Sequence, residues 1–269
     1  MSLRIIEWKE LVSPLCEKNE PRGMTIGIFD GVHRGHVELI RCVIEYGKCP
    51  TVLTFRQHPQ KILKPENYPG NIFCIEQKLA VFEELGIEQV ILIDFSEDFS
   101  RMKGQEFINL LIDKGNLNFL VIGSGFRCGY RQDTGAELIK SMNEAKGIPT
   151  KIISPIQDET GPISSSRIRM AITQGNLSLA AALLGRNVEL VLGPKKCVPW
   201  HTDWKITEEM LILDVSGRLI PPPERYRVLL QKTWEVDIVL RDGKVFIPFS
   251  TIGVKDLESW ERIKIEFLP

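Results

Sequence analysis

Four short apolar runs, separated by helical stretches, constrain the fold of this chain more than any other feature. The runs are TIGIF (25–29), TVLTF (51–55), QVILIDF (89–95) and FLVIG (119–123). They are nearly continuous in apolar residues, whereas a strand with one face in water alternates apolar and polar residues. The pattern therefore predicts strands that are buried on both faces of a parallel sheet.

The segments between these runs carry apolar residues at helical spacing. Gly86 follows the second such segment, at a position where glycine commonly ends a helix. Alternating strands and helices are joined by right-handed crossovers, so we expect residues 1–186 to form a doubly wound α/β domain with a parallel sheet. The helical faces are made by Val37, Leu39, Ile40, Val43 and Ile44, by Leu79, Phe82 and Leu85, and by Phe107, Ile108, Leu110 and Leu111.

Helical spacing stops near residue 188, and short strand-like runs replace it. We therefore expect residues 187–269 to form a second, smaller domain that is antiparallel and β-barrel-like. Within 234–249, Asp242-Gly243 predicts the tight turn of a hairpin. The other strand-like runs lie at 188–193, 210–215 and 226–230.

Charge and cysteine spacing argue against several classes of protein. Thirty-four Lys and Arg balance 35 Asp and Glu, whereas general nucleic-acid binding usually needs a basic excess. The six cysteines include no Cys-x-x-Cys pair, which suggests free thiols in a reducing compartment. The charged N-terminal segment does not resemble a signal peptide, and no apolar stretch is long enough to span a membrane. We expect a cytoplasmic protein without nucleic-acid or membrane partners, and its oligomeric state stays open.

The segment GIFDGVHRGH (27–36) is the first candidate site. It leaves a predicted strand, passes two glycines and opens a helix near His36. A helix start at the carboxyl end of a parallel strand offers free N–H groups and partial positive charge to a phosphate. His33 and His36 flank Gly35, so both imidazoles can reach the space in front of the helix. Anion binding is the favoured interpretation.

Two other interpretations of the histidine pair stay open. The imidazoles could be metal ligands, with Asp30 or His58 completing the site, although no further cluster of His and Cys supports this. They could also be surface histidines near a turn. We expect no metal ligands in the protein itself.

The segment GPISSSRIR (161–169) is the second candidate site. Its three serines offer capping hydroxyls before a helical run, and Arg167 and Arg169 are suited to phosphate oxygens. An ordinary capped helix with solvated arginines is the alternative. Two helix N-termini that can each bind phosphate together suggest a triphosphate that is held from two sides.

Four segments carry a resemblance to a known family: GIFDGVHRGHVELI, TFRQHP, VIGSGFRCGYRQDTG and ISSSRIRMAITQGNLSLAAALLGR. In this order and spacing they resemble the N-terminal module of the prokaryotic riboflavin kinase/FAD synthetase family, over roughly residues 22–186. The resemblance implies a nucleotidylyltransferase domain that joins ATP and FMN to give FAD and pyrophosphate, with Mg²⁺ carried by ATP. Such a transfer needs no protein nucleophile, because positioning and charge stabilisation carry the catalysis.

The resemblance also implies roles for single residues. His33, His36 and Arg169 would be the catalytic residues, and the two histidines would hold the ATP phosphates. Phe126 and Arg127 would lie near the flavin or adenine end. His58, which follows a predicted strand in TFRQHP, is a candidate to face the flavin phosphate, with an ordinary loop histidine as the alternative. The remaining ATP-binding residues would be Gly27, Phe29, Asp30, Gly35, Ser164, Ser165, Ser166 and Arg167.

The chain departs from the family pattern chiefly on the flavin side. Ile28 replaces the usual Asn, and Gln57 replaces a proline. Gly125, preceded by Ser124, replaces an Asp or Asn that is thought to contact substrate or metal. The phosphate-binding half is intact, since Ser166 keeps the hydroxyl of the usual threonine. A nucleotidylyltransferase with another phosphomonoester acceptor, or a silent nucleotide- or flavin-binding protein, is therefore an alternative.

The C-terminal module of that family is a riboflavin kinase barrel, which carries a G-x-P-T-A-N-like element. This chain lacks the element: the corresponding stretch, 197–204, reads CVPWHTDW. We expect a degenerate kinase module without riboflavin kinase activity. Trp200 and Trp204 are candidates for stacking on a flavin, with ordinary packing as the alternative.

Overall fold

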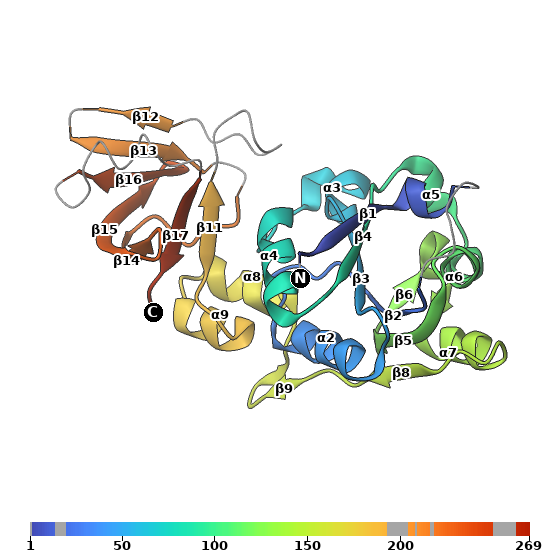
Figure 1. The fold of residues 1–269 in the computed structure, drawn as a ribbon. Helices are drawn as coiled ribbons and strands as arrows, with labels where there is room; N and C mark the ends of the chain where they lie inside the picture. Colours follow the sequence, from blue (N-terminus) through green and yellow to red (C-terminus); the bar gives the residue numbers. More distant parts are fainter. Residues whose placement is uncertain (1, 14–19, 193–203, 208, 216–217, 250–261) are drawn as a thin grey trace. The chain divides into compact units, whose positions relative to one another are not determined.

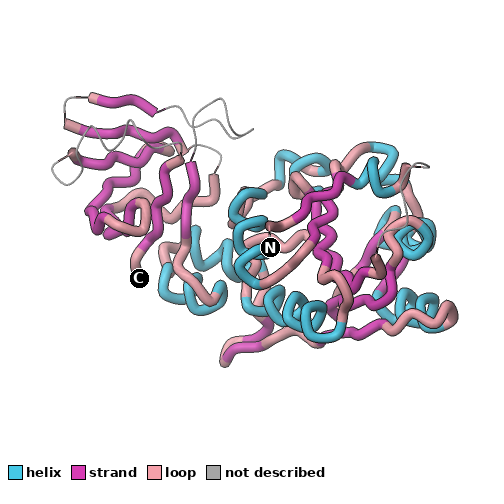
Figure 2. The backbone as a smooth tube through the Cα atoms, in the orientation of Figure 1, coloured by secondary structure: helices cyan, strands magenta, loops and turns pink. Residues whose placement is uncertain are grey.

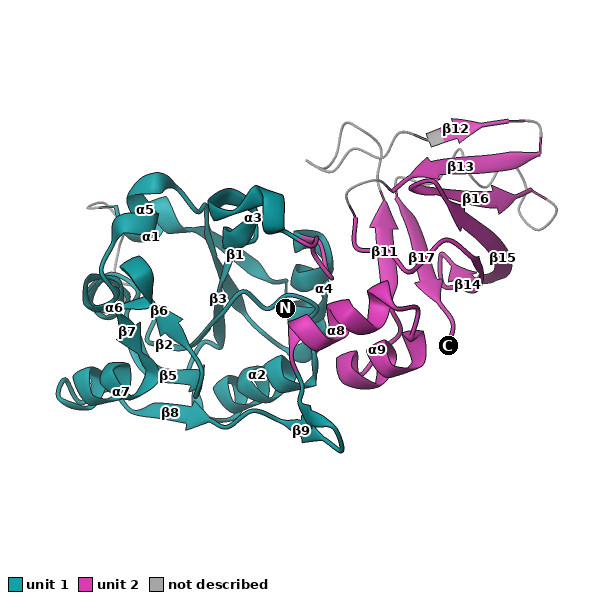
Figure 3. Ribbon diagram, turned by 180° about the vertical axis from the view of Figure 1, so that it is seen from behind, with its two compact units in different colours: residues 1–68, 75–163 teal, residues 69–74, 164–269 magenta. Residues whose placement is uncertain are grey.

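The structure is a computed structural model that describes residues 2–13, 20–192, 204–207, 209–215, 218–249 and 262–269 (Figure 1). Helices and strands alternate through the first half of the chain, and strands dominate its C-terminal part (Figure 2). The chain divides into two compact units (Figure 3). Unit 1 comprises residues 1–68 and 75–163, and unit 2 comprises residues 69–74 and 164–269.

Unit 1 is built on a six-stranded sheet with the order β1-β4-β3-β2-β5-β8. Every pair of neighbouring strands is parallel, which confirms the predicted fold class. The strands are β1 (Arg4–Glu7), β2 (Arg22–Ile26), β3 (Thr51–Phe55), β4 (Gln89–Ile93), β5 (Leu117–Gly123) and β8 (Thr150–Ile153). The four strands taken from the apolar runs are the inner ones, while β1 and β8 lie at the edges.

Helices cover both faces of this sheet. On one face, α6 and α7 pack over alternate residues of the inner strands and form one apolar cluster with them. On the other face, α2 packs against β2 and β5. The helices of unit 1 are α1 (Trp8–Leu11), α2 (Arg34–Tyr46), α3 (Pro59–Leu63), α4 (Ile75–Leu85), α5 (Glu97–Arg101), α6 (Gly104–Asp113) and α7 (Ala136–Glu144), with the 3₁₀ turns η1 (Pro65–Asn67) and η2 (Tyr130–Gln132).

The strand order reverses at β2. The chain runs outward from β2 through β3 to β4, and then returns to place β5 on the other side of β2. In sheets of this kind, ligands bind beyond the carboxyl ends of the strands at such a reversal. The fold therefore predicts a ligand-binding site at the loop that follows β2. Short pairs complete the unit: β6 (Arg127–Cys128) with β7 (Thr134–Gly135), and β9 (Gln157–Asp158) with β10 (Gly161–Pro162).

Two predicted element boundaries are wrong at this loop. The strand expected to reach Phe29 ends at Ile26, because Phe29 adopts a positive φ of 52° that a strand cannot accommodate. The helix expected near His36 begins at Arg34, with His33 in an extended conformation as its N-cap. His36 therefore lies in the first turn of α2 rather than before it. Similarly, β4 ends at Ile93 rather than two residues later.

Unit 2 contains a curled antiparallel sheet with the order β11-β17-β14-β15-β16-β13-β12 (Figure 1). This confirms the predicted antiparallel, barrel-like architecture. The β15–β16 hairpin turns at Asp242 and Gly243, whose φ angles of 52° and 67° suit the predicted tight turn. The strands are β11 (Glu189–Leu192), β12 (Trp204–Ile206), β13 (Met210–Asp214), β14 (Arg225–Leu230), β15 (Trp234–Arg241), β16 (Lys244–Pro248) and β17 (Ile263–Phe267).

Unit 2 also contains two helices, α8 (Ser165–Thr173) and α9 (Leu177–Leu184). The proposed domain boundary after residue 186 falls between α9 and β11, and it stays a prediction about domains. The stretch 197–203, on which the loss of the kinase element was argued, lies outside the described residues, as do Trp200 and the side chain of Trp204. Within the described part of the chain, no helix is long and apolar enough to cross a membrane.

Candidate functional site

The loop between β2 and α2 has a backbone that ordinary residues rarely adopt. Phe29, Gly31 and Val32 all have positive φ angles, of 52°, 79° and 38°. A residue other than glycine in this region costs on the order of 1–3 kcal/mol, and a β-branched one such as Val32 is an outlier. Strain of this kind persists only where surrounding contacts impose it, and it concentrates in functional loops.

Buried contacts impose this conformation. The Phe29 side chain is fully buried and meets Phe82 of α4 edge-on, with 5.6 Å between the ring centroids. It also contacts the His36 ring at 5.1 Å. Asp30 is buried as well. The structure thus brings Phe29, Asp30 and both histidines together at the carboxyl end of β2.

The two imidazoles form one stacked pair. Their centroids are 3.7 Å apart and their planes are 19° from parallel. His33 is only 6% exposed, and His36 is half-buried. The Nδ1 atoms of both rings are buried, and within the described residues neither has a hydrogen-bond partner. Because buried polar atoms are almost always satisfied in folded proteins, these two atoms are available to bond a ligand or a water molecule.

Burial keeps both imidazoles neutral at pH 7. It lowers the pKa of His33 to about 4, against a smaller opposing effect from the Asp30 carboxylate. Burial also lowers the pKa of His36 well below its ordinary value, and a protonated His33 and the charge of Lys78 act in the same direction. A neutral imidazole can donate a hydrogen bond from its ring N–H to a phosphate oxygen, but it carries no positive charge that would pair with the phosphate.

The depressed pKa of His33 makes stability depend on pH. Between about pH 6.5 and pH 4 the unfolded chain binds a proton that the folded chain refuses, so the free energy of unfolding falls as the pH falls. The measurement is urea unfolding of the wild type and of His33→Gln at pH 7 and at pH 5. We expect the free energy of unfolding to fall by about 2 kcal/mol less in His33→Gln than in the wild type between these two pH values. Equal losses in the two proteins would contradict the burial of His33.

The glycine between the histidines makes room for the stacked rings. A Cβ atom at Gly35 would lie 3.3 Å from Cε1 and Nδ1 of His33, which is tighter than an ordinary contact. Arg34, by contrast, is exposed. The first turn of α2 therefore presents its N–H groups and its partial positive charge beside two neutral imidazoles.

The second candidate segment opens helix α8 in unit 2. Ser164 is the N-cap, and its Oγ accepts a hydrogen bond from the backbone N–H of Arg167 over 3.4 Å. Ser165 and Arg167 are half-buried, whereas Ser166 is exposed. The guanidinium of Arg169 donates through Nε to the carbonyl of Gly70 over 3.1 Å.

The residues predicted on the flavin side have separate surroundings within unit 1. His58 is the N-cap of α3, and its Nδ1 accepts from the N–H of Gln60 over 3.2 Å. Phe126 is half-buried and packs against the apolar core, while Arg127 is exposed and donates to the Gln132 carbonyl over 3.1 Å. Their roles toward a flavin stay predictions.

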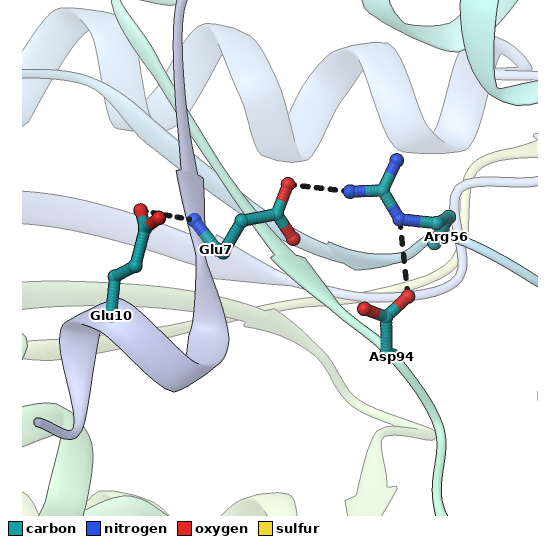
Figure 4. Close-up of polar contacts among 4 residues, drawn as sticks. All are labelled: Glu7, Glu10, Arg56 and Asp94. Carbon is teal, nitrogen blue, oxygen red and sulfur yellow. Dashed lines mark hydrogen bonds and ion pairs between the residues drawn. The ribbon is translucent and has the colours of Figure 1, made fainter.

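Sequence reasoning missed two charged groups at this edge of the sheet. One is Lys78 of α4, which is buried beneath the histidine loop. The other is Arg56, which follows β3 and pairs with Glu7 at the end of β1 (2.5 Å) and with Asp94 after β4 (3.1 Å; Figure 4). The Arg56 network ties together the carboxyl ends of three neighbouring strands. The only sequence signal for Lys78 was its position, because it lies on the same face of α4 as the apolar residues Ile75 and Phe82.

A search for groups of three or more His, Cys, Asp and Glu side chains finds none that could hold a metal ion among the described residues. The donors near the histidine loop are imidazole nitrogens and a single buried carboxylate, whereas Mg²⁺ prefers several oxygen ligands. In the part of the chain that the structure describes, the side chains around the histidine loop therefore do not fit a magnesium site built by the protein.

Comparison with known proteins places this site in a family. The FAD synthetase family model matches residues 16–167, which is more than half of the chain. The chain therefore belongs to the FAD synthetase family, a family of nucleotidyltransferases. This confirms the resemblance found in the sequence.

Individual curated relatives also support membership of this family. The chain is 31% identical to the bifunctional riboflavin kinase/FMN adenylyltransferase of Buchnera aphidicola, over 63% of this chain and 56% of the relative. It is 30% identical to the enzyme of that name from Escherichia coli, over 60% of this chain and 53% of the relative. The chain thus matches little more than half the length of these relatives.

One solved structure is similar along nearly the whole chain. It is the crystal structure of a protein described as a macrolide-efflux protein from Streptococcus pneumoniae. The TM-score is 0.76 and the identity 23%, and the match covers 99% of this chain and 90% of that one. At this identity the likeness concerns the fold alone.

Proposed function

We propose that the chain is an FMN adenylyltransferase. In the proposed reaction, a phosphate oxygen of FMN attacks the α-phosphorus of ATP, the bond to the bridging oxygen of the β-phosphate breaks, and FAD and pyrophosphate form. The observation that supports it most directly is the pair of buried, neutral imidazoles with unsatisfied Nδ1 atoms, at the strand-order reversal of a family member.

The proposed chemistry uses positioning and charge stabilisation. His33 and His36 would hydrogen-bond the oxygens that gain charge as the phosphorus is attacked. The first turn of α2 would supply further N–H donors. The strained backbone at Phe29 and Val32 would keep these groups in place before the substrate arrives. Gly27, Asp30 and Gly35 would shape the same loop. Mg²⁺ would arrive with the triphosphate of ATP, where it neutralises phosphate charge.

The second phosphate-binding group in this proposal is the start of α8. Ser164, Ser165 and Ser166 would offer hydroxyls to the triphosphate, and Arg167 and Arg169 would add charged donors. The flavin would lie toward His58, Phe126 and Arg127. This part of the proposal rests on the family resemblance of the segments.

We also propose that riboflavin kinase activity is absent and that the protein works in the cytoplasm. The first proposal rests on the missing kinase element at 197–204. The second is supported by the free thiols of Cys42, Cys49, Cys74 and Cys128, which suit a reducing compartment.

A product assay with two flavins tests the substrate assignment. The purified chain is incubated with ATP and Mg²⁺ and with either FMN or riboflavin, and the flavin products are separated by chromatography. We expect FAD from FMN and no phosphorylated product from riboflavin. FMN or FAD from riboflavin would show that the kinase activity survives. ATP binding without FAD would favour a different phosphomonoester acceptor or a silent binding protein.

The open space at Gly125 allows the missing polar group to be restored. A Cβ atom there would meet nothing within 4 Å, and the residue is exposed. We expect Gly125→Asn to raise kcat/KM for FMN about tenfold, because one hydrogen bond to a charged group contributes roughly 1.5 kcal/mol. Gly125→Ala is the control, since it fills the same space without a polar group. A similar rate for both variants and the wild type would contradict the idea that position 125 limits the reaction.

A further inference from the structure

A buried ammonium group lies under the histidine loop. Lys78 is only 6% exposed, although lysine is almost never fully buried without polar partners. Its Nζ donates to the carbonyls of Ile28 and Phe55, each over 3.1 Å, and lies 3.5 Å from Oγ1 of Thr54. Three acceptors around a desolvated cation form a rigid arrangement, because hydrogen bonds to charged groups are the strong ones.

Those acceptors belong to the two segments that border the site. The Ile28 carbonyl precedes Phe29, the first residue of the loop with positive φ, and the Phe55 carbonyl ends β3. Thr54 completes the link, because its hydroxyl donates to the same Ile28 carbonyl over 3.1 Å. Lys78 thus joins the histidine loop to the neighbouring strand from below.

The same charge acts on the imidazole pair. Besides burial, the positive charge of Lys78 lowers the pKa of His36, and so does His33 when it is protonated, while the Asp30 carboxylate acts on His33. An ammonium at this place therefore adds to the burial that keeps His36 uncharged, and it also fixes the backbone that carries the neighbours of His36.

We propose that Lys78 is a positioning residue for adenylyl transfer: its buried ammonium fixes the Ile28 and Phe55 carbonyls and thereby holds the histidine loop in its reactive shape. The expected effect of Lys78 on the rate rests on the proposed function. Its expected effect on the loop and on the titration of His36 does not depend on turnover.

Lys78→Met tests the proposal, because methionine fills a similar volume without the charge. We expect kcat for FAD formation to fall at least about tenfold, with KM for FMN changed by less than about twofold. We also expect the imidazole titration of His36, followed by NMR and assigned with His36→Gln, to move to higher pH. The chain has only four histidines, so the signals can be resolved.

The matched control is a second buried cation of unit 1. Arg22 is fully buried and donates to the Gly115 carbonyl and to Gln89, each over 2.8 Å, near the amino end of β2. We expect Arg22→Gln to lower stability while leaving kcat per folded molecule and the histidine titration unchanged. An equal change in both variants would show that Lys78 is only structural and would overturn the proposal.

A second variant keeps the test informative if Lys78→Met does not fold. Thr54→Val preserves the side-chain shape and removes the hydroxyl that links Ile28 to Lys78, and we expect a smaller fall in kcat with KM unchanged. Unchanged kinetics and an unchanged His36 titration in a folded variant would overturn the proposal. If the wild type makes no FAD, the proposed function fails, while the titration shift still decides the role of Lys78.

Discussion

His36→Ala is expected to lower kcat for FAD formation by at least about a hundredfold while the fold stays intact. The imidazole lies in the first turn of α2, stacked on His33, and alanine removes a donor that a developing phosphate charge requires. Rates are measured from FAD produced under saturating ATP and FMN, and folding is checked by circular dichroism.

Arg34→Ala is the matched control for this variant. Arg34 belongs to the same first turn of α2 and lies between the two histidines in the sequence, but it is exposed. We expect its rate to stay within about threefold of the wild type. An unchanged rate for His36→Ala, or an equal loss in both variants, would contradict the assignment of the imidazole to the reacting phosphates.

Gly129→Ala is expected to destabilise the protein by at least about 3 kcal/mol. Gly129 is the last glycine of the segment VIGSGFRCG (121–129) and has a φ of 83°. A Cβ atom there would lie 2.2 Å from the backbone nitrogen of Gly104 and 2.3 Å from Oδ1 of Asp133. Because the first of these is backbone at the start of α6, the clash cannot be relieved by a side-chain rotation.

The control for this prediction lies in the same segment. Gly125→Ala introduces the same methyl group into open space at an ordinary φ, so we expect its free energy of unfolding to change by less than about 0.5 kcal/mol. Urea unfolding followed by circular dichroism measures both variants. Similar stability for the two would show that the close approach of Gly129 to α6 is absent in solution.

The predictable part of the fold came from periodicity. The inner strands of unit 1 are apolar on both faces, so their sequences mark them as strands of a covered parallel sheet. The edge strands β1 and β8 were missed because each has only four residues and is partly exposed. Propensity carries little information in segments of that length.

The motif residues were visible in the sequence, but their physical state was not. The spacing of His33 and His36 predicted a phosphate site, whereas their stacking, neutrality and buried Nδ1 atoms follow from tertiary burial. The strand appeared to continue to Phe29 because its residues are apolar, and only the packing of that ring on Phe82 explains the left-handed turn. Lys78 was missed because a lysine within a helical stretch is usually interpreted as exposed to solvent.

The measurement that tests the account most directly is the stoichiometry of the transfer itself. The purified chain is incubated with FMN, Mg²⁺ and ATP labelled at the α-phosphorus, and both FAD and pyrophosphate are quantified. We expect one labelled FAD for each pyrophosphate, and both products formed at least about a hundredfold more slowly with His36→Ala. Pyrophosphate release without labelled FAD, or label transferred only to another phosphomonoester, would contradict FMN adenylyl transfer.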